Sequence, residues 1–80
     1  MKASVFITLK SGVLDPQGKA IEGALHGLGF EDVSGVRQGK LIELELSETD
    51  EAKARSQVER MCERLLANPV MESYRIELSA

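Results

Sequence analysis

KSGVLDPQG, residues 10–18, joins a segment that alternates like a β-strand to a segment with the spacing of a helix. Asp15 followed by Pro16 predicts the start of that helix, because the Asp carboxylate accepts a hydrogen bond from a free amide of the first turn and proline fits the first helical position. A plain connector needs neither Val13 and Leu14 nor the small residues around them. We therefore interpret this loop as a contact surface.

The length and charge of the chain limit what it does. Its 80 residues form one domain, at residues 1–80, and a chain of this size buries only about 60–65% of the surface that its unfolded form exposes. A net charge of −3 argues against a nucleic-acid duplex or an anionic membrane as the main partner. A single Cys excludes an internal disulfide, and no stretch has the pattern of a zinc site, a signal peptide or a membrane-spanning helix. We expect a soluble, cytoplasmic protein.

Three segments alternate between apolar and polar residues, which is typical of strands with one buried face. Residues 2–10 form the first and residues 70–78 the last. Residues 33–46 form a longer extended segment, which fits either one strand bent at Gly39 or a short hairpin. We favour the single long strand, because the parity of its apolar residues continues through the interruption.

Two segments repeat apolar residues at the spacing of one helical face. The first extends from Pro16 to about Leu28 and ends at Gly29, where Phe30 is placed to fold back on Leu25.

The second helix begins within residues 47–50, with Ser47 or Thr49 as its cap, and ends before Pro69. Its predicted buried face consists of Ala54, Val58, Met61, Cys62 and Leu65. We interpret Cys62 as a small buried hydrophobe, since no second Cys accompanies it.

The predicted order of elements, β-α-β-α-β, gives an α+β fold with two layers. We expect an antiparallel-type sheet with a long bent second strand and both helices on one face. The opposite face then carries three apolar side chains among charged ones, Phe6, Leu41 and Met71. We predict that these residues mediate self-association, with a second copy of the chain covering this face.

Nothing in the sequence forms a catalytic constellation. The chain has one His, one Cys and one Tyr, no Gly-rich phosphate loop, and no carboxylate pair whose spacing favours acid–base catalysis. We expect no catalytic, cofactor-binding or metal-binding residues on this chain. The residues alone predict a small oligomeric interaction module.

Leu9–Gly18 resembles the N-terminal signature of the PurS family, the small subunit of phosphoribosylformylglycinamidine (FGAM) synthase in purine biosynthesis. Three later stretches are similar to the same family, in the same order: Ala24–Leu25–His26 with Leu28–Gly29–Phe30, then residues 36–40, then residues 61–70. The resemblance extends over essentially the whole chain, and its first and last stretches are specific.

The resemblance implies a non-catalytic subunit of a ligase complex, which bridges a glutaminase subunit and a large ATP-dependent synthetase subunit. In such a complex the glutaminase releases ammonia from glutamine, and the large subunit uses ATP and Mg to convert formylglycinamide ribonucleotide to formylglycinamidine ribonucleotide. The small subunit is implied to be a cytoplasmic dimer, or dimer of dimers, that supports ammonia transfer. We expect it to bind no cofactor, no nucleic acid and no membrane.

We predict that the loop and the overhanging second extended segment form the bridge. The partner-contact candidates are Gly12, Val13, Leu14, Asp15, Gln17, Arg37, Gln38 and Lys40. Arg37 and Lys40 are expected to pair with acidic side chains of a partner. The alternative is that Lys10 and Lys40 are merely solvated and that Arg37 pairs within the sheet. The alternative interpretation of the whole chain is a dimeric small-molecule-sensing regulatory module.

Overall fold

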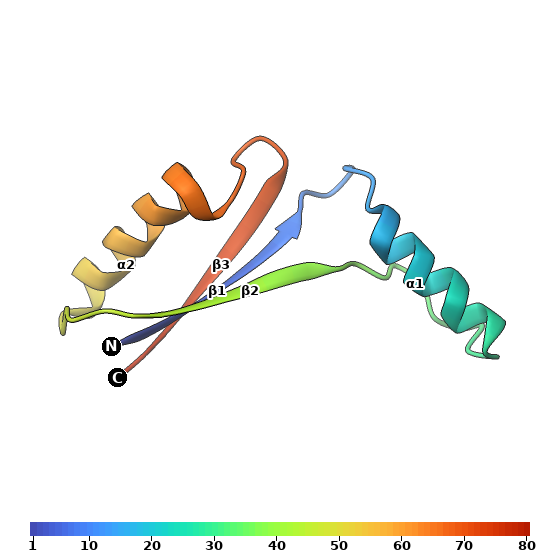
Figure 1. Ribbon diagram of the computed structural model, residues 1–80, viewed down its shortest axis with the longest axis horizontal. Coiled ribbons are helices and arrows are strands. Elements are labelled where there is room, and N and C mark those ends of the chain that lie inside the picture. The colour runs from blue at the N-terminus through green and yellow to red at the C-terminus, as the bar shows by residue number, and fades with distance from the viewer.

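The computed structural model describes residues 1–80. Its elements follow the predicted β-α-β-α-β order (Figure 1): β1 (Lys2–Leu9), α1 (Pro16–Gly27), β2 (Gly39–Glu45), α2 (Glu51–Met61), the π-helical turn η1 (Cys62–Leu66) and β3 (Glu72–Ser79). Neither helix has the length and apolar character needed to cross a bilayer.

The three strands form an antiparallel sheet in the order β2-β1-β3, with β1 in the centre. Val5 lies opposite Ile42 and Ile76, so the apolar residues of all three strands share one face. Phe6 lies opposite Leu41, which places both on the other face. The predicted α+β class and antiparallel sheet are confirmed.

The second extended segment forms one strand and no hairpin. The regular strand β2 begins at Gly39, where we predicted a bend, and residues 33–38 approach it as irregular chain. A side chain at Gly39 would clash with the carbonyl oxygen of Ile7, so glycine permits β1 and β2 to pair this closely. The hydrogen-bonded strand is therefore shorter than the predicted segment of residues 33–46.

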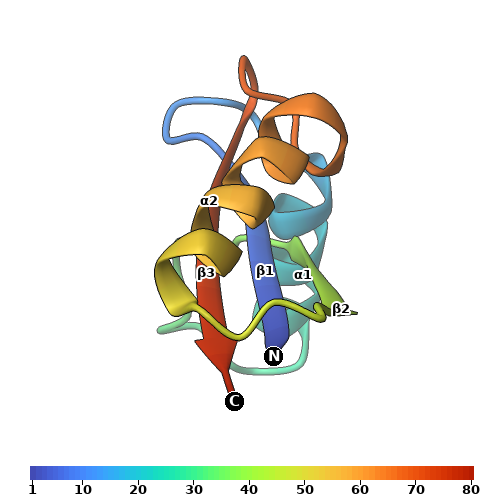
Figure 2. The ribbon, with the colours of Figure 1, turned by 90° about the vertical axis from the view of Figure 1, so that its left-hand side faces the viewer.

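The core lies between the sheet and α2, which crosses β1 and β3 on one face (Figure 2). Its fully buried side chains come from β1, α2 and η1: Ala3, Val5, Ile7, Ala54, Val58 and Cys62. The cap of α2 is Asp50, whose Oδ1 accepts a hydrogen bond from the Lys53 amide at 3.1 Å, and not Ser47 or Thr49 as predicted. All these residues are good caps, and the chain uses the last of them.

The end of the second helix differs from a regular α-helix. The Ala67 amide donates to the Cys62 carbonyl oxygen at 3.0 Å, five residues back, which defines a π-helical turn. The wider turn brings Leu66 against the core and leaves the side chain of Leu65 83% exposed. Leu65 was therefore wrongly predicted on the buried face.

Helix α1 does not cover the sheet, which corrects the prediction of two helices on one face. It extends beyond the end of the sheet and gives the molecule its elongated form of 47 × 26 × 14 Å (Figure 1). Gly18 is its only buried residue. The segment of residues 28–38 connects α1 to β2 outside the regular elements, and it leaves the helix beyond the sheet.

Candidate partner-binding surface

The loop of residues 10–15 projects from the same end of the sheet as α1. The Lys10 amide donates to the Met71 carbonyl oxygen at 2.9 Å, and the Val13 amide donates to the Lys10 carbonyl oxygen at 3.0 Å, which forms a turn. Gly12 has a φ of +89°, a conformation that favours glycine. The turn leaves the Leu14 side chain 72% exposed, which supports our interpretation of the loop as a contact surface.

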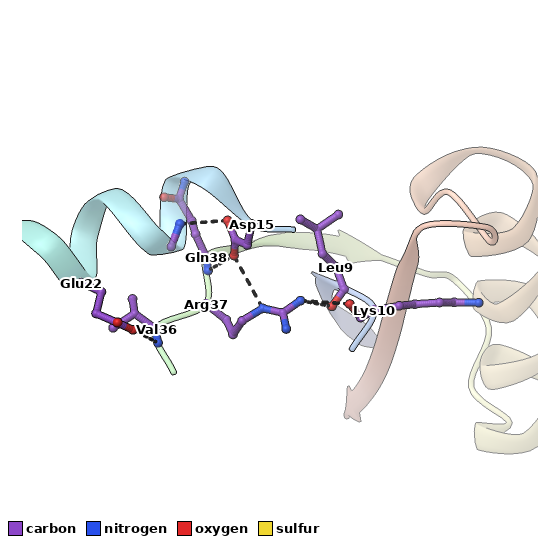
Figure 3. A network of polar contacts seen from close by, with 8 residues as sticks. Leu9, Lys10, Asp15, Glu22, Val36, Arg37 and Gln38 are labelled. Atoms are coloured by element: carbon purple, nitrogen blue, oxygen red, sulfur yellow. Dashed lines mark hydrogen bonds and ion pairs between the residues drawn. The ribbon is translucent and has the colours of Figure 1, made fainter. Parts of the chain in front are cut away.

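Asp15 caps α1 and also joins it to the chain before β2 (Figure 3). Its Oδ1 accepts from the Gly18 amide at 2.8 Å, and its Oδ2 accepts from the Gln38 amide at 2.9 Å. The Arg37 Nε lies 3.7 Å from Oδ2, and the Asp15 side chain is only 8% exposed. These donors lower the pKa of the Asp15 carboxyl, first the Gln38 amide and then the Gly18 amide.

Arg37 also contacts the end of β1. One of its terminal nitrogens, Nη2, donates to the carbonyl oxygens of Leu9 and Lys10 (Figure 3). Its guanidinium therefore links three parts of the same chain: the end of β1, the cap of α1 and the segment leading to β2. Arg37 thus makes the contact with the sheet that our alternative interpretation allowed, at Leu9 of β1, but its ion pair is with Asp15, outside the sheet, and its side chain stays 37% exposed.

Two further contacts tie α1 to the segment that returns from it. Glu22 accepts a hydrogen bond from the Val36 amide at 3.2 Å. His26 Nε2 donates to the Val33 carbonyl oxygen at 2.7 Å. The polar contacts that hold α1 and its cap to the rest of the chain are therefore all made with residues 33–38.

The structure brings the eight partner-contact candidates together where the sheet meets the start of α1. An open cleft of about 400 Å³ lies between the ends of the strands and the start of α1; Asp15, Gln17, Gln38 and Lys40 line it. Lys40 lies 4.0 Å from Glu72 across this cleft. A second hollow, of about 340 Å³, is lined by Gly12, Val13, Leu14 and Arg37.

The apolar face of α1 is the part of this surface that the sequence reasoning missed. Ile21, Leu28 and Phe30 are all exposed, Leu28 to 74%. The predicted chain reversal is confirmed, because the Phe30 amide donates to the Leu25 carbonyl oxygen at 3.0 Å and Gly29 has a φ of +101°. The helical spacing identified the apolar residues of α1 correctly, but it gave no indication that most of them remain exposed in the folded chain.

The outer face of the sheet carries two of the three self-association candidates, Phe6 and Leu41. Phe6 is half-buried and lies opposite Leu41, which is 50% exposed. The Arg75 guanidinium lies 4.2 Å above the Phe6 ring, a cation–π contact. Met71 is exposed in the turn before β3. The face therefore presents apolar surface with charged residues around it.

Two features of the chain bear on catalysis and metal binding. No three His, Cys, Asp or Glu side chains come together in an arrangement able to hold a metal ion. Cys62 is fully buried, as predicted, and burial raises the pKa of its thiol.

Comparisons with known proteins give one consistent family. Residues 2–80 match the family model PurS, described as phosphoribosylformylglycinamidine (FGAM) synthase. The PurS subunit of that synthase from Synechocystis sp. is 49% identical over 76 residues, which cover 95% of this chain and 76% of that protein.

Solved structures agree with this match. The crystal structure of Methanocaldococcus jannaschii PurS, one of the subunits of formylglycinamide ribonucleotide amidotransferase in the purine biosynthetic pathway, superposes with a TM-score of 0.85 at 47% identity, covering 95% of this chain and 92% of that chain. A chain in the structure of PurLQS from Thermotoga maritima superposes with a TM-score of 0.86 at 37% identity, covering 95% of this chain and 93% of that one.

Proposed function

Because this chain belongs to the PurS family of FGAM synthase subunits, we propose that it bridges a glutaminase subunit and a large ATP-dependent synthetase subunit of that enzyme. The chain that it resembles in Thermotoga maritima belongs to a solved structure of PurLQS, which supports a role within a complex. Family membership favours this role over the alternative of a small-molecule-sensing module.

The exposed apolar face of α1 is the observation that carries the bridging role. Leu14, Ile21, Leu28 and Phe30 all lie on the part of the chain that extends beyond the sheet. Large apolar side chains left exposed on a projecting part of a small domain are typical of sites of protein–protein contact. An element that adds little to its own core is free to pack against another chain.

We assign the chemistry to the larger subunits. In our proposal the glutaminase releases ammonia, and the large subunit binds ATP and Mg and converts formylglycinamide ribonucleotide to formylglycinamidine ribonucleotide. This chain supplies no catalytic group and binds no cofactor; it supports ammonia transfer by holding the two partners together. In our proposal the complex works in the cytoplasm.

The chain is further proposed to act as a dimer or a dimer of dimers. Two surfaces are available: the outer sheet face around Phe6, Leu41 and Met71, and the apolar face of α1. A single chain with only nine buried residues gains stability by covering either surface.

Reconstitution tests the proposal. The glutaminase and synthetase subunits are mixed with and without this chain, and FGAM formation is measured with glutamine and, separately, with ammonium as the nitrogen source. We expect this chain to raise glutamine-dependent turnover strongly and to co-elute with both partners in gel filtration. Full glutamine-dependent turnover without the chain, or turnover by the chain alone, contradicts the proposal.

A further inference from the structure

Something other than apolar packing must fix the orientation of α1. Apart from Gly18 the helix buries none of its residues, and it lies beyond the sheet. Its connections to the sheet are the loop of residues 10–15 and the returning segment of residues 28–38. The orientation of α1 therefore depends on contacts between these two connections.

Asp15 makes the contact that joins them. Its Oδ1 is used within α1, for the Gly18 amide, whereas its Oδ2 accepts from the Gln38 amide, 23 residues further along the chain. Arg37 lies beside the same Oδ2 and bonds in turn to the carbonyl oxygens of Leu9 and Lys10 at the end of β1. We call the contacts of the Asp15 carboxylate with the Gln38 amide and Arg37 the Asp15 latch.

Asp50, the cap of α2, shows that capping alone does not require these contacts. Its carboxylate accepts one hydrogen bond, from the Lys53 amide, and the residue remains exposed. Asp15 caps its helix in the same way, yet its side chain is almost completely buried and its second oxygen is bonded outside the helix. The second oxygen has a role that a cap does not explain.

Gly18 provides independent support. A side chain at this position would clash with the carbonyl oxygen of Val36 and would crowd the Asp15 carboxylate. Glycine is thus needed for the first turn of α1 to lie against the returning segment. Gly23 and Gly27 on the same helix have open space around them, so Gly18 is the only glycine of α1 that close packing against the returning segment requires.

We propose that Asp15 is a positioning residue: through its latch to Gln38 and Arg37 it sets the orientation of α1 relative to the sheet, and so the geometry of the surface offered to the partner subunits. The statement about the partner subunits rests on the proposed function. The statement about α1 concerns the chain alone and is tested separately.

The first test is Asp15→Asn, with Asp50→Asn as its matched control. Asn caps a helix as well as Asp does, but it has one acceptor oxygen in place of two and no charge for Arg37. Amide hydrogen exchange is measured on the full-length chain. In Asp15→Asn we expect exchange at Gln38 to rise about tenfold or more, the factor set by losing one hydrogen bond to a charged group, while Gly18 stays protected and helix content by circular dichroism is unchanged. Asp50→Asn should leave Gln38 unaffected.

A second pair of variants tests the latch without changing Asp15. Gly18→Ala should raise exchange at Gln38 in the same way, because the new methyl group displaces Val36 or the carboxylate. Gly23→Ala, in open space on the same helix, should not. Unchanged exchange at Gln38 in both Asp15→Asn and Gly18→Ala, or an equal rise in either control, overturns the proposal.

Assembly gives the functional measurement. We expect Asp15→Asn to bind the glutaminase and synthetase subunits at least about tenfold more weakly than Asp50→Asn, the effect of an interface element that is no longer pre-organised. Equal binding by these two variants overturns the part of the proposal that concerns the interface. If the wild-type chain binds neither partner, the bridging function fails, while the exchange measurements still decide whether the latch sets the position of α1.

Discussion

The two helices of this protein have the same type of N-terminal cap but pack in different environments. Each has an Asp at its N-cap, Asp15 for α1 and Asp50 for α2. Helix α2 buries Ala54 and Val58 completely against the sheet, whereas α1 buries only Gly18. The comparison teaches that a cap decides where a helix begins and says nothing about what the helix packs against. The apolar face of α2 builds the core, and that of α1 is left at the surface.

The largest expected effect is a difference in the free energy of unfolding between the same substitution on the apolar face of α2 and on that of α1. Val58→Asp places an unpaired charge in the core and should lower the free energy of unfolding by about 3–5 kcal/mol, enough to unfold much of the population. Ile21→Asp, on the exposed face of α1, should change it by less than about 0.5 kcal/mol in the monomer. Urea unfolding at low chain concentration measures both.

In the complex with the partner subunits, substitutions on the exposed face of α1 should have a large effect on binding. Ile21→Asp adds a charge to the surface proposed for contacts and should abolish co-elution with the partner subunits, although the chain remains folded. If Ile21→Asp unfolds the monomer as readily as Val58→Asp does, then α1 belongs to the core and the comparison between the helices is wrong.

A smaller effect tests how α2 closes the core. Leu66 packs against the core after the π-helical turn, and Leu65 beside it is exposed. Leu66→Ala should lower the free energy of unfolding by about 2 kcal/mol, at the low end for a buried Leu because Leu66 is only partly covered. Leu65→Ala should be within about 0.5 kcal/mol of the wild type. The opposite ranking indicates a regular α-helix through residue 66.

Local features of this fold could be predicted because residues a few positions apart determine them. Asp15 and Pro16 marked the start of α1, and Gly29 marked its end. Alternation of apolar residues placed Val5 and Phe6 on opposite faces of the sheet, as the observed register has them. The family resemblance then gave the function that no local pattern carries.

The remaining features depend on contacts that a single sequence does not encode locally. An apolar helical face has the same pattern whether it packs against its own sheet or against another chain, so the position of α1 could not be predicted. The bond from the Gln38 amide to Asp15 spans 23 residues and has no periodic signal. Leu66, and not Leu65, packs against the core because the helix ends in a π-helical turn. No pattern in the sequence predicted that turn.

The smallest expected effect concerns the acid limit of the latch. The pKa of the Asp15 carboxyl lies below its ordinary value of 3.8, because the Gln38 and Gly18 amides and Arg37 favour the charged form. A lowered pKa in the folded state means that the carboxylate stabilises the fold fully above the unfolded pKa of about 3.9, and that this contribution is lost as the pH falls through the lower, folded value. The latch should therefore stay closed at neutral pH and open only as the pH falls below the ordinary pKa of the carboxyl.

The carboxyl carbon of Asp15, followed by NMR, should titrate with a midpoint below 3.8, and exchange at the Gln38 amide should rise over the same pH range. In Asp15→Asn the side chain does not ionise, so exchange at Gln38 should already be fast at neutral pH and should show no such step in acid. A midpoint at or above 3.8 means that the carboxylate is not held by these donors, and α1 is then positioned by its remaining contacts, those of Glu22 and His26.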